Sequence, residues 1–184
     1  MKAVMISIKP KWVEKIASGE KTVEVRKTAP KIETPFKCFI YMTQGKLKEL
    51  GDYSRWIYEN RMKVIGEFVC DKIYNFVQAG MGIMFADENL NQLEPQEARH
   101  MTCLTDKEFE DYLGYKDGYG WHISDLKIYD KPKKLSEFVT KRKCDSCKVS
   151  GYESTACIWD EDCIVPHKLS RAPQSWCYVE IPRL

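Results

Sequence analysis

The sequence predicts an α+β fold in which about six strands form a compact β-barrel with short flanking helices. Three observations favour this class: strand patterns dominate, the connections between them are short, and no internal repeat or low-complexity linker separates them. The chain has 184 residues, enough for one domain with a sizeable core. We therefore expect residues 1–184 to form a single domain.

The expected elements follow from hydrophobic periodicity and from residues that start or stop helices. In the segment 21–27, Val23 and Val25 share one face of a strand, while Glu24 and Arg26 share the other. Strands are predicted at 3–8, 21–27, 37–43, 63–71 (continuing toward 76), 121–129 and 176–181. Helices are predicted from Pro10 to Gly19, at 53–61, from Thr105 to Gly114 with a Thr105–Glu108 capping box, and as a short turn at 135–138.

Composition and charge are those of an ordinary globular protein, with 43% hydrophobic and 30% charged residues. The N-terminus does not resemble a signal peptide, and no apolar run approaches the roughly 20 residues of a membrane span, so we expect a cytoplasmic protein without membrane contact. The net charge is only +2, but residues 1–31 and 127–150 are basic and residues 86–117 are acidic. The two basic segments would attract phosphates if the fold joins them; otherwise they are solvated lysines.

One motif stands near the N-terminus. The sequence Gly19-Glu-Lys-Thr-Val-Glu-Val-Arg26 fits G-x-K-x-x-E-x-R, and it follows a predicted strand and helix. Together with the segments 64–69, 120–126 and 171–179, this arrangement resembles the ASCH domain family, a branch of the PUA-like β-barrels, in its bacterial and prophage form. The resemblance covers most of the chain apart from the cysteine-rich segment.

The resemblance implies a cleft in the barrel with Lys21, Glu24 and Arg26 on or near its wall. The ASCH family is generally supposed to bind RNA, and some members are amidohydrolases acting on a modified cytidine or ribonucleases. The amidohydrolases place a threonine nucleophile three residues after the motif lysine, where this chain has Glu24. That activity is therefore not carried over.

The motif residues have several chemical uses. Arg26 suits a phosphate or carboxylate, and Lys21 suits a phosphate or, if desolvated, a catalytic base that Glu24 assists. The alternative is a structural ion pair at the barrel mouth. Lys9 and Lys11 would extend a ligand-binding patch.

Aromatic and polar residues in two later segments are further candidates for ligand contacts. Trp121 and Trp176 could stack on a base, and His122, Arg171 and Gln174 could bind its polar groups. The alternatives are buried tryptophans, a structural histidine and a loop that only closes the barrel.

Four cysteines cluster in the segment 141–168, which we expect to be a cysteine-rich insert. Cys144, Cys147, Cys157 and Cys163 are spaced so that four thiolates can close a structural zinc site. Free thiols or a thiol–disulfide pair are the alternatives.

Three functions remain open from the sequence. The leading hypothesis is an RNA- or nucleotide-binding protein with a basic cleft, acting as a monomer. The second is a hydrolase acting on RNA or a modified nucleoside in the same cleft, with Lys21 and Glu24 as catalytic residues. The third is a regulatory adaptor that uses the acidic region 87–117 as a protein-binding surface.

Overall fold

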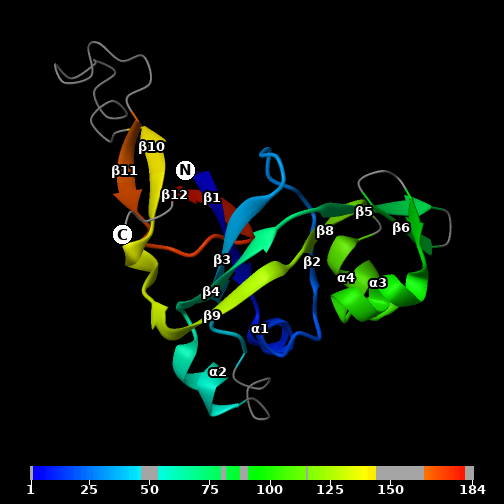
Figure 1. Cartoon of the computed structure of the whole chain (residues 1–184), viewed down its shortest axis with the longest axis horizontal. Helices are drawn as coiled ribbons and strands as arrows, with labels where there is room; N and C mark the ends of the chain where they lie inside the picture. Colours follow the sequence, from blue (N-terminus) through cyan, green and yellow to red (C-terminus); the bar gives the residue numbers. More distant parts are fainter. Residues whose placement is uncertain are drawn as a thin grey trace.

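The computed structural model describes residues 2–46, 54–79, 82–87, 91–114, 116–143 and 164–180. Their strands form two sheets, shown in Figure 1. The larger sheet has the order β11 (Ile164–Lys168), β10 (Val139–Lys143), β12 (Trp176–Glu180), β1 (Lys2–Ile8), β3 (Phe36–Met42), β4 (Val64–Cys70) and β9 (Ser124–Lys133). The smaller sheet has the order β2 (Val23–Arg26), β8 (Gly118–His122), β5 (Ile73–Ala79), β6 (Gly82–Ala86) and β7 (Gln92–Leu93).

The helices are short and lie outside the sheets. They are α1 (Pro10–Ala17), α2 (Arg55–Asn60), α3 (Pro95–Thr102) and α4 (Asp106–Leu113), with a 3₁₀ turn at Leu135–Glu137. The Thr105–Glu108 capping box is present at the start of α4, and Gly114 ends this helix in the left-handed conformation with φ of 65°. The mixed α+β class is thus confirmed.

The prediction of a closed barrel of about six strands was wrong for the described residues. The predicted strand at 63–71, continued toward 76, is two strands, β4 and β5, which belong to different sheets. The predicted strand at 121–129 likewise divides into β8 and β9 at Ile123. Strand-like patterns continue across both points, so periodicity did not reveal where the chain leaves one sheet for the other.

The crossover from β1 to β3 places the motif strand at the centre of the molecule. These two strands pair in parallel, with Ser7 opposite Tyr41, so the chain between them must return across the sheet. That return contains α1 and β2, and β2 pairs with β8 in the second sheet. The end of β1 and the motif strand therefore lie close together, where the two sheets meet.

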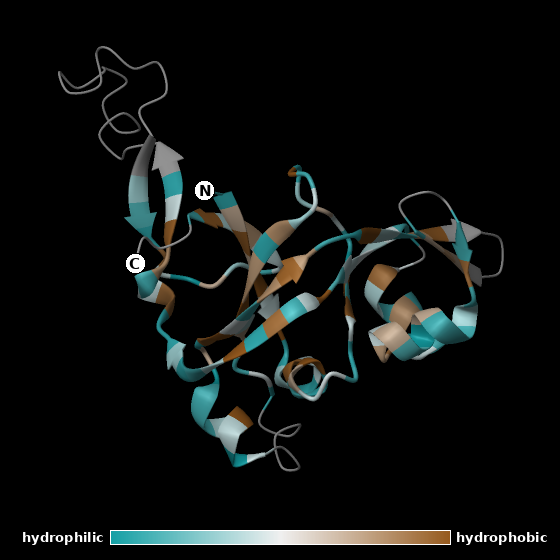
Figure 2. Ribbon diagram, viewed as in Figure 1, coloured by the Kyte–Doolittle hydropathy of each residue, from teal (hydrophilic) through white to brown (hydrophobic). Residues whose placement is uncertain are grey.

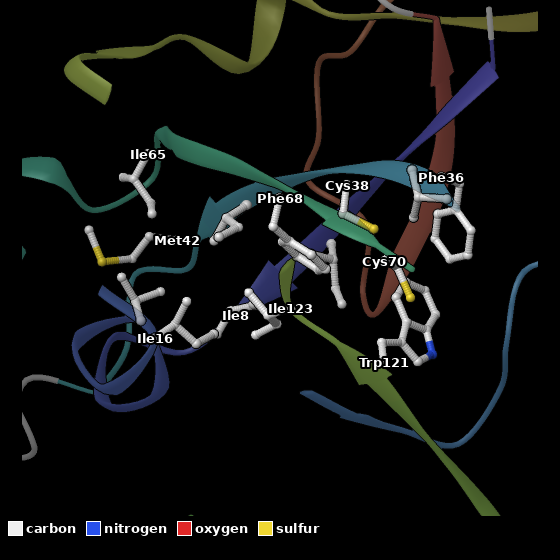
Figure 3. Packing of buried hydrophobic residues seen from close by; sticks show 14 of the residues in the cluster. Ile8, Ile16, Phe36, Cys38, Met42, Ile65, Phe68, Cys70, Trp121 and Ile123 are labelled. Carbon is white, nitrogen blue, oxygen red and sulfur yellow. The ribbon is translucent and has the colours of Figure 1, made fainter. Parts of the chain in front are cut away.

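Two apolar clusters stabilise this arrangement. Figure 3 shows the first, in which Phe36, Cys38, Phe68 and Cys70 from β3 and β4 point toward Trp121 of β8. The rings of Phe36 and Trp121 meet edge to face with centroids 5.9 Å apart. This cluster joins the two sheets.

The second cluster fixes α3 and α4 on the smaller sheet. Phe76 of β5, Phe85 of β6 and Phe109 of α4 contact one another edge to face at 5.1 to 5.6 Å. Figure 2 shows apolar residues along the central strands and a mixture of apolar and polar residues on both helices. Part of the acidic region 87–117 therefore packs against the sheet through an apolar helix face.

The contact between β4 and β9 gives a test of the packing. A Cβ atom added at Gly66 would lie 2.5 Å from the backbone oxygen of Lys127. We expect Gly66→Ala to lower the free energy of unfolding by about 1–3 kcal/mol, because β9 would have to move away. Urea unfolding measures this change, and Lys127→Ala, at an exposed side chain on β9, is the control. Equal stability of both variants and the wild type would contradict the close approach.

Candidate functional site

A cavity of about 730 Å³ lies where α1, β2, α4 and the loop before β12 meet. Its size falls within the range of small-molecule sites in proteins. The lining residues are Ser7, Lys9, Lys11, Trp12, Lys21, Glu24, Val25, Arg26, Thr43, Leu104, Glu108, Asp111, Tyr112, Gln174 and Ser175. Six residues that the sequence singled out thus lie around one hollow: Lys9, Lys11, Lys21, Glu24, Arg26 and Gln174.

The motif places three charged side chains in a row on the wall of this cavity. Glu24 lies between two cations, with its Oε2 3.4 Å from the Nζ of Lys21 and its Oε1 3.1 Å from an Nη of Arg26. All three residues are buried, with exposed fractions of 2% for Lys21, 6% for Glu24 and 7% for Arg26. A carboxylate shared by two cations offsets part of the cost of burying them.

Backbone oxygens also accept hydrogen bonds from the side chains of Lys21 and Arg26. Lys21 donates to the carbonyl of Thr102 at 2.6 Å, and Arg26 donates to the carbonyl of Ser7 at 2.5 Å. The pKa of Lys21 is lowered because burial disfavours its charged form, although the nearby Glu24 carboxylate opposes this effect. The amine of Lys21 is therefore easier to deprotonate than that of an exposed lysine.

One donor in this row has no acceptor. The Nε of Arg26 is buried and has no hydrogen-bond partner among the described residues. A buried N–H without an acceptor is unfavourable, and such groups often mark positions that a ligand or water completes. Since Arg26 lines the cavity, this donor is a candidate ligand contact.

The mouth of the cavity carries charges of both signs. Lys11 of α1 donates to Glu108 of α4 at 2.7 Å, and Asp111 lies one turn further along α4. Four basic and three acidic side chains line the whole cavity, so it is much less basic than predicted. None of the described residues of the second basic segment, 127–150, lines it, and the two basic segments do not form one patch there.

The structure places the other predicted ligand residues away from the cavity. Trp121 is fully buried in the core between the two sheets, where its ring cannot stack on a base, which corrects that prediction. His122 pairs with Asp71, with Nδ1 and Oδ1 2.6 Å apart. Trp176 packs against Trp121 and donates to Thr28 at 3.0 Å, while Arg171 is exposed and does not line the cavity.

Sequence reasoning missed the residues that α1 and α4 contribute. Trp12 was not among the predicted ligand contacts, yet it lines the cavity, with the Nζ of Lys21 5.0 Å from its ring centroid. Glu108 was predicted only as part of a capping box, and Tyr112 was not among the predicted ligand contacts. The available signal was the combination of Trp12 with flanking lysines, which is typical of a site for an aromatic or anionic ligand.

The four clustered cysteines lie outside the described residues. Within the described parts of the chain, no group of three or more metal-binding side chains comes together. Cys38, Cys70 and Cys103 are free thiols there. In the same parts, the helices are too short and too polar to cross a bilayer.

Comparison with known proteins identifies the fold. The structure is similar to the crystal structure of ASCH from Zymomonas mobilis, with a TM-score of 0.50 and 20% sequence identity over 72% of this chain and 73% of that chain. Two variants of the same protein, one tyrosine-to-phenylalanine and one serine-to-alanine, match with TM-scores of 0.48 and identities of 21% and 20%. They cover 73% and 72% of this chain, and 77% and 74% of theirs.

Neither a protein-family model nor a curated protein matches the chain. The structural match nevertheless confirms the expected resemblance at the level of fold: the fold of this chain is similar to that of ASCH from Zymomonas mobilis. In this chain the fold is made of two sheets, and the motif strand β2 belongs to the smaller one.

The ion pairs of Glu24 can be tested by stability. We expect Glu24→Gln to lower the free energy of unfolding by about 3 kcal/mol, because it leaves two buried cations without a counter-charge. Glu20→Gln is the matched control, since Glu20 pairs with Lys15 at the exposed surface and should contribute little. Chemical denaturation of both variants measures the difference. A loss for Glu24→Gln no larger than that of the control would contradict the buried network.

The zinc site remains a prediction. We expect about one zinc per chain in elemental analysis of the purified protein, because four cysteine thiolates complete a tetrahedral structural site. The double variant Cys144→Ser and Cys147→Ser should lose the metal, while Cys103→Ser should retain it. Metal-free wild-type protein that folds normally would exclude structural zinc.

Proposed function

We propose that the cavity binds RNA or a nucleotide. The observation that carries this proposal is the row of Lys21, Glu24 and Arg26 on the cavity wall, in which the buried Nε of Arg26 has no acceptor among the described residues. This row offers donors next to an acceptor. A nucleobase edge also presents donors next to acceptors, whereas a phosphate presents acceptors only.

The surrounding residues support the same ligand class. Trp12 and Tyr112 bring aromatic rings to the cavity lining, and aromatic rings are common stacking partners of unpaired bases. Lys9 is exposed at the cavity and has no ion-pair partner within the described ranges, so it is available to a phosphate. The ASCH domain fold agrees with a role in RNA or nucleotide binding.

A hydrolase acting on RNA or a modified nucleoside is the second candidate. The lowered pKa of the buried Lys21 amine favours it, because at a given pH a larger fraction of such an amine is deprotonated, and able to accept a proton, than of an exposed lysine. Incubation with total RNA and with acylated nucleosides, followed by mass spectrometry of the products, distinguishes turnover from binding. Turnover that survives Lys21→Met would exclude Lys21 as the base.

The binding proposal is tested at the exposed lysines. We expect Lys9→Ala to weaken binding of single-stranded RNA and to lower the slope of log K against log[salt] by about 1, because one phosphate contact is lost. Lys31→Ala is the control, an exposed lysine of the same basic segment that does not line the cavity. Fluorescence anisotropy at several salt concentrations measures both quantities.

Two results would contradict the proposal. The first is wild-type protein that binds neither single-stranded nor structured RNA in a salt-dependent way. The second is an equal effect of Lys9→Ala and Lys31→Ala, which would place the RNA outside the cavity.

A further inference from the structure

Glu108 forms an ion pair with Lys11 at the mouth of the cavity, where this lysine could otherwise bind a ligand phosphate. Its Oε1 accepts a hydrogen bond from the Nζ of Lys11 at 2.7 Å, across 97 positions of sequence. Both residues line the cavity, and Lys11 belongs to α1 while Glu108 belongs to α4. The ion pair therefore joins the two helices across the site.

The carboxylate of Glu108 cannot turn away without disrupting its helix. Its Oε2 accepts hydrogen bonds from the backbone N–H of Thr105 at 3.0 Å and from the Thr105 hydroxyl at 3.1 Å. The bond from the backbone N–H is half of the capping box of α4. One oxygen thus fixes the helix end, and the other faces Lys11.

Glu108 is also held in its charged form. Partial burial favours the neutral acid, but the hydrogen bonds from Lys11 and Thr105 outweigh it and lower the pKa of Glu108. Of the four basic residues of the cavity, Lys21 and Arg26 pair with Glu24, and Lys11 pairs with Glu108. Asp111 adds a further carboxylate at the rim. The lining therefore has at most one positive charge in excess.

We propose that Glu108 is a specificity-determining residue that selects ligands with a single negative charge. This inference rests on the proposed nucleotide-binding function. A phosphodiester within an RNA chain carries one negative charge, whereas a terminal phosphate monoester carries nearly two at pH 7.5. The cavity then favours a nucleotide inside a chain over a free mononucleotide, because the second charge meets the fixed carboxylate of Glu108.

Pairs of nucleotides that differ by one negative charge on the phosphate test this selection. The four ribonucleoside 5′-monophosphates and their phosphate methyl esters share base, sugar and phosphate, but the esters carry one charge less. Isothermal titration calorimetry at pH 7.5 compares each pair. We expect the wild type to bind the methyl esters more tightly than the monophosphates.

Glu108→Gln tests the residue directly. Glutamine preserves the capping box, so the unfolding midpoint should change little. We expect the preference for the esters to fall by about three- to fivefold, the effect of one partly exposed charge. Asp111→Asn, which removes a rim carboxylate outside the cap, should shift the preference in the same direction. Glu110→Gln is the control, with the same charge change at an exposed residue of α4 that does not line the cavity.

The outcomes separate this inference from the function on which it rests. Wild-type protein that binds the monophosphates more tightly than the esters overturns the selection by Glu108 but leaves nucleotide binding intact. Equal shifts in Glu108→Gln and Glu110→Gln overturn it as well. Failure of every protein to bind any of these eight compounds overturns the inference, and the proposed function fails with it only if the wild type also shows no salt-dependent binding of RNA.

Discussion

The site depends on one carboxylate, that of Glu24, held between two buried cations. Without it, Lys21 and Arg26 would be unpaired charges inside the protein. Unpaired buried charges strongly destabilise the folded state, and folded proteins are only marginally stable. With it, the motif strand carries a rigid row of donors and an acceptor along a cavity wall. The backbone carbonyls of Ser7 and Thr102 connect this row to β1 and to α3, so the site also holds elements together.

The same principle of compensated charge extends to the cavity mouth. Lys11 is paired with Glu108, and among the described residues that line the cavity Lys9 is the cation without an ion-pair partner. A site built this way does not attract anions by net charge. In the proposed function, it recognises a ligand through the order of donors and acceptors on the wall, while aromatic rings and a rim lysine would contribute stacking and phosphate contact. Such a division suits a nucleotide better than an inorganic anion.

The sequence predicted the α+β class, the motif strand and the capped helix α4, because these features are local. Alternation placed Glu24 and Arg26 on one strand face, and the capping box marked the first turn of α4. The sequence did not predict that Glu108 faces Lys11, since a contact across 97 residues depends on the packing of two helices. Nor did it show that Trp121 belongs to the core, because the sequence pattern around a tryptophan in a strand is the same whether its side chain is buried or exposed.

The sheet change was missed for a related reason. At Ile123 and between Cys70 and Ile73 the chain passes from one sheet to the other without a glycine or proline to mark the place. At these points the backbone N–H groups find acceptors in other segments: His122 donates to the carbonyl of Lys72, and Ile123 donates to the carbonyl of Thr22. These bonds connect positions far apart in the sequence, and no single segment predicts them.

A crystal structure with a short single-stranded RNA is the most direct measurement of where ligands bind. The cavity account predicts one nucleotide inserted beside Trp12, with an acceptor atom within hydrogen-bond distance of the Arg26 Nε. RNA lying along the lysines of β9 and β10, with the cavity unoccupied and the Arg26 donor unchanged, would contradict it.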